Sequence, residues 1–217
     1  MKVEIWSDVV CPWCYIGKRR FETALTRFEQ RDQIEVLWRS FQLDPTAPRT
    51  SDESLNQILS RKHGLTLRQA NDTTNHVTEL AALEGLEYHF DRAQSGNTFD
   101  AHRLIHLAAA HQLQDAMKER LMKAYFTEGL PIGNQDTLVQ LATEVGLDRD
   151  EARTVLNSDT YADEVKADIE MATELGIRGV PFFVVDEKYG ISGAQPAEVF
   201  LNALEQAWAE SHQLTNS

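Results

Sequence analysis

Cysteine is the scarcest informative residue in this 217-residue sequence, which contains only Cys11 and Cys14. The sequence also lacks an excess of positive charge, because 21 basic residues face 34 acidic residues and leave a net charge of −13. An acidic surface repels phosphate groups and anionic lipids, and no basic patch offsets it. We therefore expect no nucleic-acid partner and no membrane-surface partner. The length also excludes a small disulfide-stapled scaffold and allows one large domain or a domain with an insertion.

Long apolar runs are missing as well. The first eight residues lack the apolar core and cleavage site of a secretory signal. No later run is long enough to span a bilayer. We therefore expect a cytoplasmic location, where stable structural disulfides are unusual. In that setting the two thiols act as a pair or together with a second molecule.

The N-terminal segment predicts a strand, a helix and a second strand. Residues 2–7 alternate like a short strand, and the Cys11-Pro12-Trp13-Cys14 motif follows directly. Apolar residues recur at helical spacing over 15–30, and 34–38 is rich in strand-forming residues. This order predicts a parallel crossover unit, with the two cysteines at the point where a strand turns into a helix.

The central region predicts helices only. The expected helices span 51–63, 66–84, 98–111, 115–127, 135–145, 149–157 and 159–175. Thr50 with Glu53 and Thr66 with Gln69 fit capping boxes at the first two of these helices. We therefore predict an α/β fold, in which a domain formed by 1–48 and 164–217 is interrupted by a helical insertion domain at 49–163.

Strand signal returns near the C-terminus. Residues 180–185 form an apolar β-type run, a turn is expected at 186–190, and Ile191-Ser192 can pair back across it. Pro196 fits the first position of a final helix. Within this region, Pro181 must begin its strand, lie at a sheet edge or follow a cis peptide bond.

The position of the two cysteines suits thiol chemistry. Two cysteines can simply be small buried hydrophobic residues. A cysteine at a helix N-terminus, however, faces unpaired N–H groups that favour its thiolate, and only the thiolate attacks a disulfide. A second cysteine one turn later can close an internal disulfide. We therefore predict Cys11 as the nucleophile and Cys14 as the resolving thiol, whereas the carboxylate of Asp8 would raise the thiol pKa.

Several motifs together resemble one known family. They are residues 7–17 around the dithiol, the helical insertion, Gly179-Val180-Pro181-Phe182-Phe183, and Ile191-Ser192-Gly193-Ala194-Gln195. In this order they resemble the DsbA-like thioredoxin-fold oxidoreductases of the FrnE type over essentially the whole chain. The resemblance implies that the domain formed by 1–48 and 164–217 is thioredoxin-like. It also implies that Val180-Pro181 is cis and faces Cys11. It also implies that substrate binds across Pro12, Trp13, Val180 and Pro181.

The same superfamily contains kappa-class glutathione transferases and 2-hydroxychromene-2-carboxylate isomerases, in which a serine replaces the dithiol. This sequence departs from them because it keeps both cysteines. The segment 97–104 resembles a stretch shared across the wider group, so Asn97 and His102 are further substrate-binding candidates. A plain alternative is an Asn cap followed by an ordinary helix.

A zinc site is a weaker interpretation of the same residues. His102 and His106 are four apart and could join Cys11 and Cys14 around a tetrahedral zinc ion. The histidines are remote in sequence from the cysteines, whereas a structural zinc usually uses two close pairs. We therefore predict no bound metal and no cofactor, with glutathione as a candidate redox partner.

Two hypotheses about function remain open. The first is a thiol–disulfide oxidoreductase acting on protein or small-molecule disulfides through a mixed disulfide. The second is a non-redox role, either a glutathione-dependent isomerase or transferase of small aromatic metabolites or a module that binds unfolded clients. The sequence favours the first and leaves open the direction of reaction, the physiological substrate, and whether the chain forms a homodimer.

Overall fold

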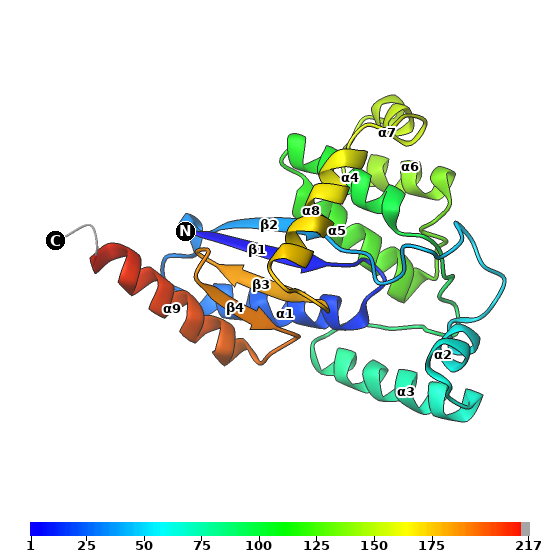
Figure 1. Cartoon of the computed structure of the whole chain (residues 1–217), viewed down its shortest axis with the longest axis horizontal. Coiled ribbons are helices and arrows are strands. Elements are labelled where there is room, and N and C mark those ends of the chain that lie inside the picture. Colours follow the sequence, from blue (N-terminus) through cyan, green and yellow to red (C-terminus); the bar gives the residue numbers. More distant parts are fainter. Residues whose placement is uncertain (214–217) are drawn as a thin grey trace.

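The computed structural model describes residues 1–213 and contains a four-stranded sheet (Figure 1). The strand order is β2-β1-β3-β4. Strand β1 (Lys2–Ser7) runs parallel to β2 (Glu35–Ser40) and antiparallel to β3 (Phe182–Val185), which pairs in turn with β4 (Tyr189–Ser192). The parallel β1–β2 pair confirms the predicted crossover unit, and the β3–β4 hairpin confirms the predicted return of the chain.

Helices cover both faces of this sheet. Helix α1 (Pro12–Arg27) and helix α9 (Ala197–Gln213) pack against each other, and the rings of Phe21, Phe183 and Phe200 meet between them and the sheet. Helix α8 (Ala162–Glu174) packs against β2 and crosses the opposite face (Figure 1). Because successive side chains of a strand point to opposite faces of the sheet, the core has one layer on each face.

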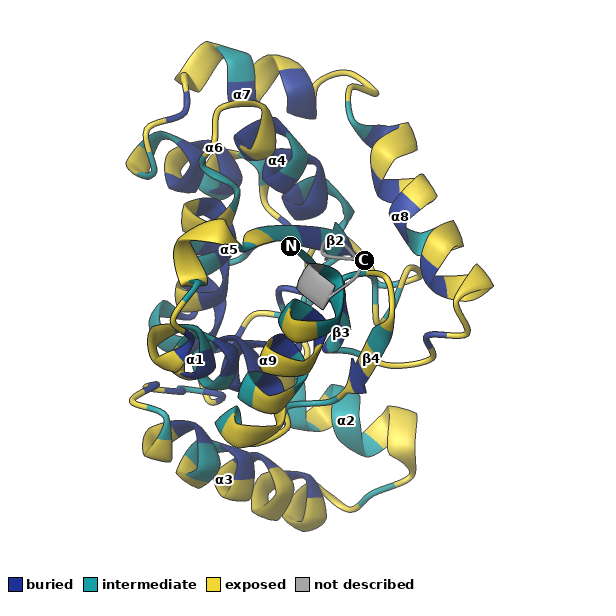
Figure 2. Ribbon diagram, turned by 90° about the vertical axis from the view of Figure 1, so that its left-hand side faces the viewer, coloured by how far each residue is buried: buried dark blue, intermediate teal, exposed yellow. Residues whose placement is uncertain are grey.

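The remaining helices lie between β2 and α8 in the chain and form a helical insertion. They are α2 (Leu55–His63), α3 (Leu67–Leu83), α4 (Phe99–Ala110), α5 (Gln114–Lys123), a π-helical turn (Ala124–Glu128), α6 (Gln135–Glu144) and α7 (Arg149–Leu156). A short 3₁₀ turn (Arg31–Gln33) precedes β2. Helix α4 has seven buried residues and α5 and α6 have four each, whereas α2 has none that is fully buried (Figure 2). No helix within residues 1–213 is long and apolar enough to cross a membrane.

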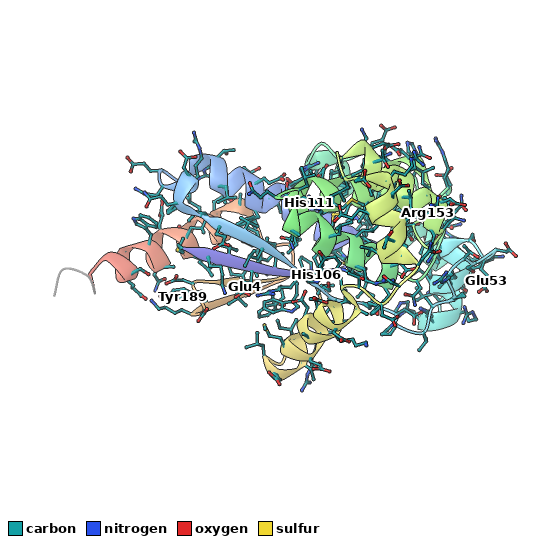
Figure 3. All side chains as sticks on the ribbon, turned by 90° about the horizontal axis from the view of Figure 1, so that it is seen from above. Glu4, Glu53, His106, His111, Arg153 and Tyr189 are labelled. Atoms are coloured by element: carbon teal, nitrogen blue, oxygen red, sulfur yellow. The ribbon has the colours of Figure 1, made fainter. Side chains whose placement is uncertain are left out.

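A charged network joins the insertion to the sheet. Arg39 pairs with Glu4 on β1 and with Asp168 on α8. Asp168 also accepts a hydrogen bond of 2.8 Å from the Ser40 backbone N–H and contacts His106 Nε2 at 3.1 Å. Glu4 and His106 lie at the junction between the sheet and the insertion (Figure 3). The network therefore fixes α4 and α8 to the end of the sheet near which the dithiol lies.

Most predicted helices form, with differences at their ends. Helix α2 begins at Leu55, so the predicted capping box of Thr50 and Glu53 is wrong. Ser54 and Gln57 form the capping box instead, while Glu53 pairs with Arg61. Both stretches have the right spacing, but Ser54 lies directly before Leu55, the first residue of α2.

Other helix ends shift for local reasons. The capping box of Thr66 and Gln69 is confirmed. The helix expected at 159–175 begins at Ala162 because Tyr161 adopts a left-handed φ of 63°. The final helix begins at Ala197, so Pro196 precedes its first residue rather than occupying it. The predicted domain boundary at 163/164 falls in the first turn of α8 and stays a prediction.

Candidate active site

The two thiols lie where β1 passes into α1. Cys11 is the N-cap of α1, Pro12 occupies the first helical position, and Cys14 completes the first turn, its N–H bonded to Cys11 O at 3.0 Å. Both cysteines are reduced, and their exposed fractions are 4% and 1% respectively. Because the first N–H groups of a helix lack helical partners, this position favours a negative charge on sulfur.

The loop before β3 lies directly against the dithiol. The Val180–Pro181 peptide bond is cis, as the family resemblance implies. The Cys11 thiol donates a hydrogen bond to Val180 O at 3.5 Å. Pro181 packs on Gly17 of α1, where an added Cβ would lie 3.0 Å from Pro181 Cγ. A glycine at position 17 therefore allows the loop to approach the helix that carries both cysteines.

A cleft of about 630 Å³ opens beside Cys11. The dithiol motif and Val180 form one wall, and helices α2 and α3 form the opposite wall. Most of the lining is apolar and includes Trp13, Leu43, Leu55, Ile58, Val77 and Phe90. Trp13 is 39% exposed and Leu43 is 51% exposed, so both are open to a ligand entering the cleft. The volume is suited to a drug-sized molecule or to side chains of a bound peptide.

Asp8 is a buried carboxylate next to the dithiol. It accepts hydrogen bonds of 2.8 Å from the N–H groups of Val9 and Leu43 and contacts His102 Nε2 at 3.2 Å. Burial opposes ionisation of Asp8, but the bond from His102 and the other donors hold its pKa below the ordinary value. Burial lowers the pKa of His102 despite the nearby carboxylate. The pair is therefore an ionised carboxylate and a neutral imidazole that donates to it.

The two thiols titrate as a pair. The hydrogen bond to Cys14, burial and the charge of Cys14 raise the pKa of Cys11 well above its ordinary value, and Asp8 adds to this effect. Burial opposes ionisation of Cys14, but the hydrogen bond from Cys11 and the charge of Lys118 lower its pKa. The reduced pair therefore carries one negative charge readily and a second only with difficulty. The expected influence of Asp8 on the Cys11 pKa is confirmed in its direction.

Lys118 is a neighbour of the dithiol that the sequence patterns did not single out. It lies on α5 with no exposed surface, and its Nζ donates to Ser7 O at 3.0 Å. A signal was present, because Lys118 is three residues before Leu121 and four before Met122, both of which are fully buried. A lysine on the apolar face of a helix is unusual enough to mark a candidate site.

Comparison with known proteins places this geometry in a family. The family model of the DSBA-like thioredoxin domain matches residues 2–205. The chain belongs to that family. A probable DsbA oxidoreductase from Streptomyces coelicolor is 46% identical, with 97% of this chain and 91% of that chain covered and a TM-score of 0.92. The thioredoxin-like fold with a helical insertion is thereby confirmed.

More distant matches span the same length. The uncharacterized protein YwbO of Bacillus subtilis (strain 168) is 28% identical over 214 residues, which cover 93% of this chain and 94% of that protein. The cytosolic disulfide reductase DsbM from Pseudomonas aeruginosa has a TM-score of 0.65 at 17% identity, with full coverage of both chains. A 2-hydroxychromene-2-carboxylate isomerase has a TM-score of 0.70 at 15% identity, with 99% of each chain covered. The last two likenesses show the fold alone.

Within this DSBA-like chain, the two further candidates lie away from the cleft lining. Asn97 donates to the carbonyls of Pro45 and Ala47 and accepts from the Phe99 N–H at 2.9 Å, so it fixes the 42–48 loop. It borders a separate cavity of about 330 Å³. His102 lies behind the dithiol, where it contacts Asp8. Neither Asn97 nor His102 lines the cleft, so a direct contact of either with substrate stays a prediction.

The histidines of the zinc interpretation have different partners. His102 contacts Asp8, whereas His106 contacts Ser40 Oγ and Asp168. Within residues 1–213, no group of three or more His, Cys, Asp or Glu side chains is arranged to hold a metal ion. The described geometry therefore places the two histidines in separate hydrogen-bond networks.

Proposed function

We propose that this DSBA-like protein is a thiol–disulfide oxidoreductase of the FrnE type, with Cys11 as nucleophile and Cys14 as resolving thiol. The observation that carries the proposal is an asymmetry between the two sulfurs. Cys11 lines the cleft, caps α1 and contacts the cis-proline loop, whereas Cys14 lies behind it and does not line the cleft. A substrate disulfide entering the cleft therefore meets Cys11 first.

The proposed reaction has two exchange steps. The proton that Cys11 donates in its hydrogen bond to Cys14 passes to the Cys14 sulfur, and the resulting Cys11 thiolate attacks one sulfur of a substrate disulfide. A mixed disulfide forms, and the other substrate sulfur leaves as a thiolate that takes up a proton. Cys14 then loses its proton and attacks Cys11 Sγ, which breaks the mixed disulfide and releases the second substrate thiol. The substrate gains two electrons and two protons, and the dithiol becomes a disulfide. The reverse sequence oxidises a substrate dithiol.

The proposed substrate-binding surface consists of Pro12, Trp13, Val180 and Pro181. Pro12, Trp13 and Val180 line the cleft together with Cys11, and the cis peptide bond joins Pro181 to Val180. The apolar residues of the far wall, Leu55, Ile58, Leu59 and Val77, suit an apolar peptide side chain or the body of a small-molecule disulfide. Glutathione is the proposed redox partner, and a solved structure of the cytosolic disulfide reductase DsbM from Pseudomonas aeruginosa contains it. A cytoplasmic location is part of the proposal.

Dithiothreitol-dependent reduction of insulin, or refolding of scrambled ribonuclease, tests the proposal. We expect activity in the natural protein and none in Cys11→Ser. Cys14→Ser is the matched variant, because it removes the same atom one helical turn away but leaves the attacking thiol in place. It should form a mixed disulfide that accumulates. Full activity of Cys11→Ser, with unchanged thermal unfolding, would refute the proposal.

The size and apolar lining of the cleft favour one alternative function, the glutathione-dependent isomerisation or transfer of a small aromatic metabolite. In that case glutathione supplies the only reacting thiol, so turnover should persist in Cys14→Ser and be indifferent to oxidation of the dithiol. Turnover that disappears with either cysteine supports the oxidoreductase instead. The equilibrium constant of the dithiol with glutathione then separates an oxidising couple from a reducing one.

A further inference from the structure

A lysine amine is buried beside the dithiol without an acidic partner. Lys118 has no exposed surface. Its Nζ donates to Ser7 O at 3.0 Å and lies 5.5 Å from the centre of the Trp38 ring. Within the described part of the chain, no carboxylate lies within 4.0 Å of this nitrogen. A buried charge normally requires a paired opposite charge, so this amine needs another source of compensation.

A second buried lysine shows what ordinary compensation looks like. Lys18 is 2% exposed and lies 5.9 Å from the centre of the same Trp38 ring. It contacts Glu22, and it lies 3.2 Å from Asp115 and 3.1 Å from Glu119. Burial opposes the charge on Lys18, but these carboxylates outweigh it and raise the pKa. Lys118 occupies a similar position without such a set of carboxylates.

The negative charges that face Lys118 are those of Cys14, Asp8 and Cys11. Burial lowers the pKa of Lys118 to about 8, while the charges of Cys14, Asp8 and Cys11 act in the opposite direction and Lys18 adds to the lowering. Asp8 is already bonded to two backbone N–H groups and His102, and His102 is neutral.

Ser7 connects Lys118 to the resolving thiol. The backbone carbonyl of Ser7 accepts a hydrogen bond from Lys118 Nζ, and the side chain of Ser7 lowers the pKa of Cys14. In residues 1–213 the Ser7 hydroxyl has no hydrogen bond of standard geometry to any other group. Lys118 and Cys14 therefore approach the same residue of β1 from different helices.

We propose that Lys118 is a positioning residue for the redox reaction, with an ammonium group that compensates the thiolate charge of the reduced dithiol. This inference rests on the function proposed above. In the resolving step the Cys14 thiolate attacks Cys11 Sγ, the bond from Cys11 to the substrate sulfur breaks, and that sulfur leaves with the electron pair. The negative charge leaves with the substrate, so Lys118 releases its proton to the solvent, and the substrate thiolate takes up one proton.

The reduced protein therefore keeps Lys118 charged, and the oxidised protein does not. Because the ammonium group stabilises a thiolate and has no thiolate to stabilise in the disulfide, it favours the reduced form. Lys118 thus makes the couple more oxidising. Loss of the charge should raise the pKa of the dithiol and make the couple more reducing.

Lys118→Met tests the inference by two measurements. In the reduced protein, the ultraviolet absorbance of the thiolate should reach its midpoint about one pH unit higher than in the natural protein, the low end of the effect of an opposite charge. Above both midpoints the equilibrium constant with glutathione should change about tenfold, or about 30 mV toward a more reducing couple. Equal midpoints and equal constants in the two proteins would overturn the inference.

Lys18→Met is the matched control, because it removes a buried lysine near the same tryptophan that already has carboxylate partners. It should leave the thiolate midpoint unchanged, whereas a shift equal to that of Lys118→Met would overturn the inference. If Lys118→Met does not fold, the natural protein provides the test. Lysine-selective NMR should show Lys118 titrating at a lower pH in the oxidised form than in the reduced form, and identical titrations overturn the inference. A different result would refute the proposed function, namely the absence of disulfide exchange in the natural protein.

Discussion

Replacing Asp8 by Asn removes a buried charge from the neighbourhood of the dithiol and keeps the shape of the side chain. The carboxylate accepts from two backbone N–H groups at 2.8 Å, those of Val9 and Leu43. An Asn side chain has one oxygen, so its amide group must face one of these donors. The unpaired N–H costs about 1–3 kcal/mol. For a chain of this size, that corresponds to a fall in unfolding temperature of about 2–12 °C.

The same change should make the dithiol more acidic. The charge of Asp8 contributes to the raised pKa of Cys11, so its removal lowers the pKa of the pair. If the midpoint falls by about one unit, the thiolate fraction below both midpoints rises about tenfold. Nucleophilicity falls with pKa at a Brønsted slope near 0.4–0.5, so exchange with glutathione disulfide should be only about threefold faster.

Thiolate absorbance against pH, the exchange rate and thermal unfolding together test this reasoning. Asp168→Asn is the matched control, because Asp168 is also buried, accepts from the Ser40 N–H at 2.8 Å and contacts a histidine, His106. It should lower stability similarly and leave the thiolate midpoint unchanged. An Asp8→Asn variant that is destabilised but has an unchanged or higher thiolate midpoint would refute the electrostatic role of Asp8.

Three further outcomes follow from contacts around the same helix. Gly17→Val should lower the free energy of unfolding by about 1–3 kcal/mol and slow the reduction of insulin, because even a Cβ would lie 3.0 Å from Pro181 Cγ. An unchanged unfolding temperature contradicts this packing. Tyr88→Phe removes a 2.8 Å hydrogen bond to Pro12 O, so the free energy of unfolding measured with denaturant should fall by about 0.5–1.5 kcal/mol. A stabilised variant would argue against that bond. The folded pKa of Asp8 is lowered, so its stabilising effect is complete above the unfolded pKa of about 3.9 and is lost as pH falls through the folded value. The stability gap between the natural protein and Asp8→Asn should therefore shrink in acid, and a gap that widens there contradicts the ionised state.

Local patterns predicted the elements because each depends on neighbours in sequence. The alternation of Val3 and Ile5 and the helical spacing after Tyr15 identified β1 and α1. The start of α2 was missed because two capping signals overlap within a few residues. Ser54 forms the cap, and the spacing of the residues alone does not distinguish the two signals.

The surroundings of the dithiol depend on contacts between distant parts of the chain. Asp8 and His102 are 94 residues apart, and Lys118 reaches Ser7 over 111 residues. Neither contact has a local sequence pattern, although a lysine on an apolar helix face was a usable sign. The cleft was also beyond the sequence, because its far wall comes from α2 and α3 and its shape depends on how these helices meet the thioredoxin-like domain.

Trapping the mixed disulfide tests the assignment of the two cysteines most directly. Cys14→Ser and Cys11→Ser are each incubated with glutathione disulfide, and peptide mass mapping locates the adduct. The account predicts a glutathione adduct on Cys11 in Cys14→Ser and little or none on Cys14 in Cys11→Ser, because Cys11 alone of the two lines the cleft. An adduct that forms as fast on Cys14 as on Cys11, or on neither, would contradict it.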